Sequence, residues 1–172
     1  AVLPADDPFW GDYYNAAGAI YNMLGNYEAA LKYGLQEIVF FEKIGSRLDL
    51  AIASNNVGAY YRGRGDFDRA LEYTQSALRH FFSLSDTDQA DLAWTYGNLS
   101  KIWYRKKDFQ QAIAYAEKAL AILQKHSPDD HLLMIQTYLD LANAGIEVKD
   151  YEKAREYLQT ALQMHQQNNL DD

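Results

Sequence analysis

Small and apolar side chains recur at i, i+3, i+4 and i+7 in four stretches of the chain, which is the spacing of a helix buried on one face. The third stretch places Tyr96, Leu99, Ser100 and Trp103 at these positions. The other stretches carry Tyr14, Ala17, Gly18 and Tyr21, then Val57, Gly58 and Tyr61, and finally Tyr138, Leu141 and Ala142. No window alternates apolar and polar residues for long enough to indicate a strand. The pattern therefore predicts an all-α protein.

Each of these predicted helices is followed by a turn and by the start of a second helix. Four segments align on this frame at offsets of 40, 42 and 42 residues: Gly25–Leu31, Gly65–Leu71, Lys107–Ile113 and Lys149–Arg155. In each segment a Gly or Lys closes one helix, an Asp or Asn caps the next, and an aromatic residue follows. An alanine three residues after the aromatic indicates a close approach of two helices. Repetition at this period is typical of stacked-repeat proteins and predicts about eight helices in antiparallel pairs.

The turn of the second copy spells Arg64-Gly65-Asp66, a tripeptide known as an integrin-binding signal. The other copies have Leu24-Gly25-Asn26, Lys106-Lys107-Asp108 and Val148-Lys149-Asp150 at the same place. We therefore interpret the tripeptide as a turn between two helices rather than as an adhesion motif.

The frame resembles the tetratricopeptide repeat, whose pattern W-x2-L-G-x2-Y is followed by two alanines on a helix-turn-helix unit. The resemblance covers about residues 11 to 167, and its best copy contains Val57-Gly58-x2-Tyr61. The fourth copy departs most, because Gly145 stands where an aromatic residue is expected. The longer period of 40 to 42 residues is similar to that of kinesin light chain, Pins-type adaptors and bacterial peptide-sensing regulators. These relatives bind peptide or protein segments.

The resemblance implies a right-handed superhelical solenoid of four helix-turn-helix units. We expect one domain over residues 8–167, with repeats at about 11–50, 51–92, 93–134 and 135–167, and flexible termini at 1–7 and 168–172.

Composition narrows the possible partners. A formal net charge of -8 and a pI near 4.9 argue against a nucleic-acid partner, which needs a clustered basic surface. No apolar run approaches the roughly 20 residues that cross a bilayer, so we expect no membrane insertion. The chain has no cysteine, which leaves both a reducing and an oxidising compartment open. It starts Ala1-Val2-Leu3-Pro4 without a methionine, and we therefore expect that it was either cut after a targeting sequence or excised from a longer chain. We expect a soluble protein, either cytoplasmic or, if a signal sequence was removed, periplasmic or otherwise extracytoplasmic.

The inner wall of such a solenoid is built from the first helix of each pair, and its outward positions are available to a ligand. Asn56 and Asn98 occupy equivalent outward positions, and Asp140 continues the row. An amide both donates and accepts hydrogen bonds, and the resemblance implies that asparagine here holds an extended peptide backbone. The alternative is that these amides cap or bridge neighbouring helices.

Basic and aromatic residues share the predicted wall. Arg62, Lys101 and Arg105 suit a ligand with an acidic side chain or a free C-terminus, although exposed charges usually only solvate a helix. Trp94 and Tyr104 are expected apolar anchors, with core packing as the alternative. The predicted peptide-binding set is Asn15, Asn22, Asn55, Asn56, Arg62, Trp94, Asn98, Lys101, Tyr104, Arg105 and Asn143.

The sequence offers little for catalysis. It lacks a Gly-rich phosphate loop, a G-x-S-x-G elbow and an H-E-x-x-H pair, so we predict no enzyme and no cofactor. Two histidines and two aspartates between His126 and His131 resemble metal ligands, but Asp129 or Asp130 is better explained as a helix cap, and we predict no metal.

The sequence thus predicts a non-catalytic scaffold that holds a peptide or protein segment in its groove. The alternative is a ligand-sensing module of a larger signalling protein, such as a kinase, a cyclase or a transcription regulator. A more remote alternative is an enzyme that uses the groove as a substrate channel. The outer face of the last helix, with Tyr157 and Leu158, lacks a polar capping helix. We expect this face to meet either more of a longer chain or, by self-association, a second copy of the protein.

Overall fold

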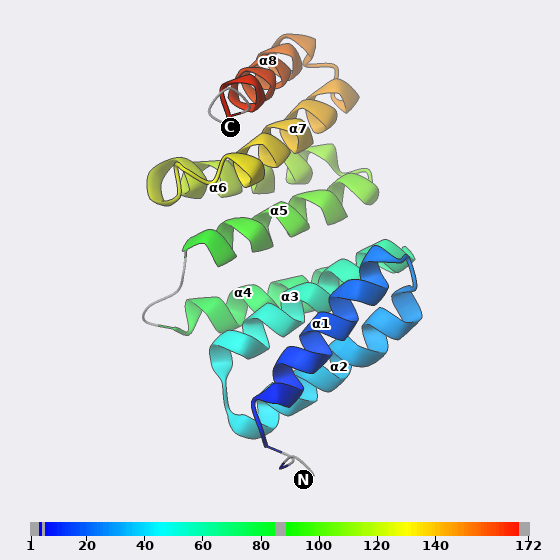
Figure 1. Ribbon diagram of the computed structural model, residues 1–172. Helices are drawn as coiled ribbons and strands as arrows, with labels where there is room; N and C mark the ends of the chain where they lie inside the picture. Colours follow the sequence, from blue (N-terminus) through cyan, green and yellow to red (C-terminus); the bar gives the residue numbers. More distant parts are fainter. Residues whose placement is uncertain (1–3, 5, 85–88, 169–172) are drawn as a thin grey trace. The chain divides into compact units, whose positions relative to one another are not determined.

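The computed structural model describes residues 4, 6–84 and 89–168, and these residues form eight α-helices and no strand (Figure 1). The helices are α1 (Phe9–Met23), α2 (Tyr27–Ile44), α3 (Arg47–Arg64), α4 (Phe67–Phe82), α5 (Gln89–Arg105), α6 (Phe109–His126), α7 (His131–Glu147) and α8 (Tyr151–Asn168). The prediction of an all-α protein with about eight helices is confirmed. Most of the two termini that we expect to be flexible lies outside the described residues.

Consecutive helices pair into hairpins, and the hairpins form two compact units. The first unit contains α1 to α4 and the second contains α5 to α8. Within the first unit α3 packs against α4, α2 and α1, and within the second α7 packs against α8, α6 and α5. A single domain over residues 8–167 stays a prediction.

The second, third and fourth hairpins begin about one helical turn before the expected repeat starts. The starts expected at 51, 93 and 135 fall inside α3, α5 and α7. The reason is that the repeat frame is defined by packing residues, whereas the first turn of each helix precedes the first packing residue.

The turn inside each hairpin follows the predicted chemistry. Asn26, Asp66, Asp108 and Asp150 each accept a hydrogen bond from the backbone N–H three residues later, at 3.1 to 3.3 Å. The residue before each cap has a positive φ: Gly25, Gly65, Lys107 and Lys149. Asp130 caps α7 in the same way through the Leu133 N–H, at 3.1 Å. These caps satisfy backbone donors that a helix start leaves without an intrahelical partner.

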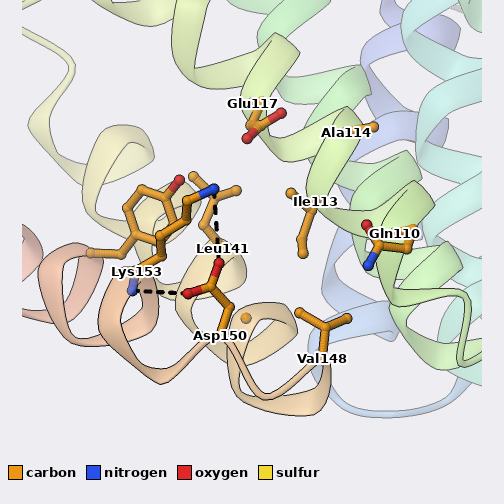
Figure 2. A pocket seen from close by; sticks show the side chains of 10 residues that line it. Gln110, Ile113, Ala114, Glu117, Leu141, Val148, Asp150 and Lys153 are labelled. Atoms are coloured by element: carbon orange, nitrogen blue, oxygen red, sulfur yellow. Dashed lines mark hydrogen bonds and ion pairs between the residues drawn. The ribbon is translucent and has the colours of Figure 1, made fainter.

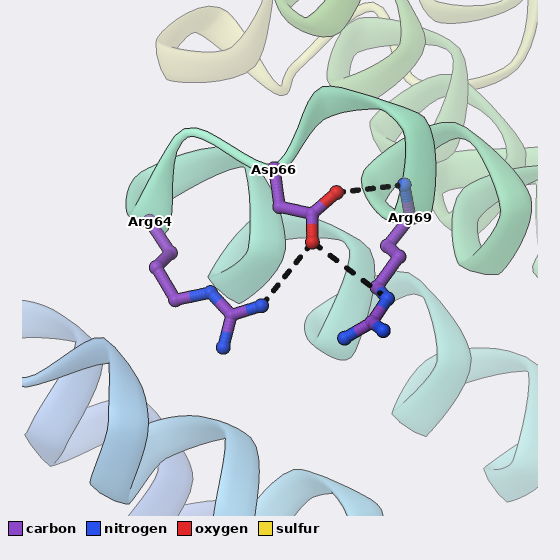
Figure 3. Close-up of polar contacts among 3 residues, drawn as sticks. All are labelled: Arg64, Asp66 and Arg69. Atoms are coloured by element: carbon purple, nitrogen blue, oxygen red, sulfur yellow. Dashed lines mark hydrogen bonds and ion pairs between the residues drawn. The ribbon is translucent and has the colours of Figure 1, made fainter.

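The Arg64-Gly65-Asp66 tripeptide is the turn between α3 and α4, as predicted (Figure 3). Asp66 Oδ1 caps α4 through the backbone N–H of Arg69, and Oδ2 lies 3.2 Å from Arg64 Nη2 and 3.7 Å from Arg69 Nε. Gly65 has φ +89°, a backbone conformation that residues with a side chain rarely adopt. The three residues are therefore explained by folding.

The alanine in each frame is buried where the two helices of a hairpin meet. Ala30, Ala70, Ala112 and Ala154 are 0 to 2% exposed. Two turns further along the second helix the equivalent residues are Glu37, Ala77, Ala119 and Ala161, and all four are buried. The first hairpin therefore buries a carboxyl group where the others bury a methyl group.

Burial raises the pKa of Glu37 to about 8, with a smaller contribution from the negative charge of Asp49. Its Oε2 has no hydrogen-bond partner among the described residues. The nearby Tyr60 is buried too, and burial, followed by the charge of Glu37, raises the pKa of its hydroxyl to about 12. Glu37 is thus held in its protonated form at neutral pH.

Among the described residues we find no helix with the length and apolar character that a bilayer crossing requires.

Replacement of Asp66 tests the cap. Asp66→Ala removes the acceptor and both ion pairs, and we expect it to lower the free energy of unfolding by about 1 kcal/mol. Asp66→Asn keeps a capping oxygen and loses only exposed ion pairs, so its loss should stay within about 0.5 kcal/mol. Urea denaturation measures both values. Equal losses would mean that the ion pairs, and not the cap, stabilise this turn.

Replacement of Glu37 tests the buried carboxyl. Between pH 4.5 and about 8 the folded state keeps a proton that the unfolded chain releases, so stability falls as pH rises through this window. One pKa unit corresponds to about 1.4 kcal/mol. Between pH 5 and 7.5 the free energy of unfolding should therefore fall by roughly 1–3 kcal/mol more in the parent than in Glu37→Gln. Urea denaturation of both proteins at the two pH values measures this. Parallel pH profiles would contradict a raised pKa at Glu37.

Candidate functional site

The polar residues of the second unit gather along α5 and α7, on what we call the α5–α7 face: Trp94, Lys101, Tyr104 and Arg105 from α5, and Asp140 and Glu147 from α7. The Lys101 ammonium lies 3.7 Å from Asp140 Oδ2. The Tyr104 hydroxyl donates a hydrogen bond of 3.3 Å to Glu147 Oε1. These two contacts link the first helices of neighbouring hairpins and hold their side chains in place.

The aromatic residues of this face remain accessible. Trp94 is 50% exposed, and the Lys101 ammonium lies 5.9 Å from the centre of its ring. Tyr104 is half-buried and packs edge-on against Phe109, with 5.4 Å between ring centres. Burial and then the charge and hydrogen bond of Glu147 raise the pKa of the Tyr104 hydroxyl, so it stays a donor. Core packing does not account for Trp94.

A hollow lies at the end of this face. It has a volume of about 510 Å³ and is lined by Tyr104, Arg105, Lys107, Phe109 and Glu147. Two cations and one carboxylate therefore surround two aromatic rings. Such a combination suits a ligand with a carboxylate and an apolar group.

The predicted asparagine row is only partly as expected. Asn56 in α3 is half-buried, and its Nδ2 donates a hydrogen bond of 3.4 Å to Asn15 Oδ1 in α1. Asn55 and Asn98 are each 4% exposed, so the expectation that they face outward is wrong. For Asn55 the reason is that α3 packs against α1, α2 and α4, which leaves little of its surface open. The contact between Asn56 and Asn15 fits the alternative in which asparagine bridges neighbouring helices.

The remaining predicted residues are divided between the units. Asn22 and Arg62 are half-buried in α1 and α3, whereas Arg105 and Asn143 are exposed in α5 and α7. The basic set of Arg62, Lys101 and Arg105 therefore has one member in the first unit and two in the second.

Sequence reasoning placed Asp140 in the row of outward positions, but it did not predict that Asp140 and Glu147 contact residues of α5. Glu147 occupies the position equivalent to Arg105, and Asp140 the position equivalent to Asn98, one period of 42 residues later. Gln136 Nε2 also donates to Asp140 Oδ1, at 3.1 Å. Equivalent positions of adjacent hairpins lie near each other in a stack. The change of charge between these copies could therefore have indicated the contacts between α5 and α7.

Each of the four helical hairpins contains the same helix cap, the same turn and a buried alanine where its two helices cross. This recurrence defines a helical-repeat protein. The family model described as tetratricopeptide repeat matches residues 11–81, 49–125 and 91–167, and the chain belongs to this family. Membership supports a protein-interaction scaffold as the class of function, and folds of this family are typically not enzymes.

Solved structures with the same fold are of the kinesin-light-chain and Rap type, in agreement with the predicted resemblance. BtubC (BKLC) from P. vanneervenii has 24% sequence identity and a TM-score of 0.81 over 92% of this chain and 64% of that one. A Rap protein complexed with Competence and Sporulation Factor has 18% identity and a TM-score of 0.84, over 95% of this chain and 44% of that one. A putative kinesin light chain from Podosopora anserina has 16% identity and a TM-score of 0.70, over 97% of this chain and 80% of that one.

The chain thus spans less than two thirds of the length of BtubC and of the Rap protein, and at these identities the likeness shows the fold alone. A search among curated proteins found no significant match.

Proposed function

We propose that the chain is a non-catalytic scaffold that binds an extended partner segment along the α5–α7 face. The observation that carries this proposal is the row of Trp94, Lys101, Tyr104 and Arg105 on one side of α5. At 1.5 Å per residue this row is about 16 Å long, which matches about five residues of extended chain. A half-exposed tryptophan at one end and an exposed arginine at the other supply an apolar anchor and a charged contact.

The partner segment carries an acidic side chain or a free C-terminus in this proposal. Arg105 is the best candidate to bind that carboxylate, because a guanidinium forms two parallel hydrogen bonds with it. Lys101 is less suited, since its ammonium is a point charge without the paired donors of a guanidinium. The Rap protein complexed with Competence and Sporulation Factor supports a ligand-binding role for this fold.

Two further roles remain proposals. The chain covers 44% of the Rap protein, which is compatible with a ligand-sensing module inside a larger signalling protein. Self-association through α8 is supported by Leu158 and Leu162, which are 41% and 55% exposed one turn apart. Light scattering across a concentration series distinguishes a monomer from a self-associated state.

A peptide library tests the binding face. We expect five-residue peptides with a free C-terminus to bind more tightly than the same peptides with an amidated C-terminus. Trp94→Ala and Arg105→Gln should each weaken binding about tenfold, or about 1.4 kcal/mol, because each removes one end of the row. Isothermal titration calorimetry measures the affinities.

Arg79→Gln is the matched control, because it makes the same chemical change as Arg105→Gln at a residue outside this face. Arg79 is exposed in α4 of the first unit. It should leave the affinity unchanged. Equal affinity of the parent, Trp94→Ala and Arg105→Gln would contradict binding on the α5–α7 face.

A further inference from the structure

A second pocket of the second unit lies between α6, α7 and α8 and has a volume of about 290 Å³ (Figure 2). Its apolar lining includes Ile113 from α6, Leu141 and Gly145 from α7, and Tyr157 from α8. Gln110, Glu117, Asp150 and Lys153 supply its polar lining. The pocket shares no lining residue with the α5–α7 face.

The repeat frame explains why this pocket is open. The positions equivalent to Gly145 hold aromatic residues in the other three copies: Tyr21, Tyr61 and Trp103. The positions equivalent to Tyr157 hold Tyr33, Tyr73 and Tyr115. In the first two hairpins these residues stack, with 5.6 Å between the rings of Tyr21 and Tyr33 and 5.3 Å between those of Tyr61 and Tyr73. The third hairpin has both residues, but there Tyr115 stacks on Tyr96, with 6.1 Å between the rings. The fourth hairpin carries no ring at the Gly145 position, and Tyr157 packs at a tilt against Tyr138, with 6.1 Å between the rings.

The packing around Gly145 does not require a glycine. A Cβ built there would lie 3.4 Å from Ala154 Cβ and 3.6 Å from the Asp150 carbonyl oxygen, which are ordinary contacts. The residue also lies inside α7 and is not among those with positive φ. Glycine is a poor helix former, so its presence here has neither a steric nor a conformational explanation.

We propose that this pocket binds an aromatic side chain, tryptophan or tyrosine, presented by a partner protein, and that this ring stacks on Tyr157 in place of the missing one. The volume is at the small end for ligand pockets, so it suits one side chain rather than a large ligand. Ile113, Leu141 and Val148 provide apolar walls for the ring.

The polar lining favours a ring that carries a hydrogen-bond donor. Glu117 lies close enough to Tyr157 for its charge to raise the pKa of that hydroxyl, after the larger effect of burial. Asp150 is already engaged: it caps α8 through the Lys153 N–H at 3.3 Å, and its Oδ2 lies 3.8 Å from Lys153 Nζ (Figure 2). Glu117 is therefore the carboxylate best placed to accept a hydrogen bond from an indole N–H or a phenol O–H.

The test uses N-acetyl-tryptophan amide as the probe and N-acetyl-leucine amide as the apolar control. We expect the tryptophan probe to shift the NMR resonances of Gly145 and Tyr157 at millimolar concentration, and the leucine compound to bind at least fivefold more weakly. Equal binding of the two compounds, or no shift at Gly145 and Tyr157, would overturn the proposal.

Gly145→Tyr supplies the ring from the chain itself and should reduce probe affinity at least tenfold. Gly145→Ala is the matched control, because it makes the same helix-favouring change without filling the pocket, and it should bind within twofold of the parent. If Gly145→Tyr does not fold, Tyr157→Ala replaces it, since loss of the stacking ring should also reduce affinity at least tenfold. Parent-like affinity in whichever of these two variants folds would refute an aromatic site.

Arg105→Gln separates this site from the proposed peptide-binding face. It should leave probe binding unchanged, because Arg105 does not line the pocket. A tenfold loss in this variant would mean that the probe binds on the α5–α7 face, and the aromatic site would be wrong while the proposed function stood.

Discussion

The structure depends on the short distance between the two helices of each hairpin. In the second hairpin a Cβ on Gly58 would lie 3.1 Å from the Ala70 carbonyl oxygen and 3.2 Å from the Thr74 backbone nitrogen. In the third hairpin Ser100 takes the place of Gly58, and its hydroxyl donates a 2.8 Å hydrogen bond to the Ala112 carbonyl oxygen. Small side chains on both helices make this approach possible in these two hairpins.

Residues away from this crossing are less constrained, and the proposed binding face is built from such residues. The α5–α7 face uses positions that point away from the crossing, so its charges can differ between copies without altering the hairpin. Gly145 and Glu37 are different, because they occupy positions that the other copies use for packing. One leaves a space unfilled and the other buries a carboxyl group, and each departs from the frame without a gain in packing.

Much of the fold could be predicted from the sequence because its determinants are local. A helix cap needs one side chain and one backbone N–H three residues away, and the four caps from Asn26 to Asp150 follow from that spacing alone. The alanines buried where two helices cross can likewise be recognised, because alanine recurs at the same position of each repeat. The interpretation of Arg64-Gly65-Asp66 as a turn rests on the same comparison between copies.

The site was predicted less well because its determinants are tertiary. Helical spacing places Asn55 and Asn98 on a face, but only the neighbouring helices decide whether that face is covered, and both residues are buried. The ion pair of Lys101 with Asp140 joins residues that are distant in sequence. The pocket beside Gly145 was visible only as a missing aromatic residue until the lining side chains from three helices could be seen together.

Exchange of glycine for alanine at two helix positions tests the crossing most directly. Gly58→Ala should lower the free energy of unfolding by roughly 1–3 kcal/mol, because the added methyl group overpacks the contact with Ala70 and Thr74. Gly97→Ala in α5 should raise it by up to about 1 kcal/mol, because a Cβ there meets no atom within 4 Å and alanine is the better helix former. If both substitutions stabilise the protein equally, the close approach of paired helices does not determine this fold.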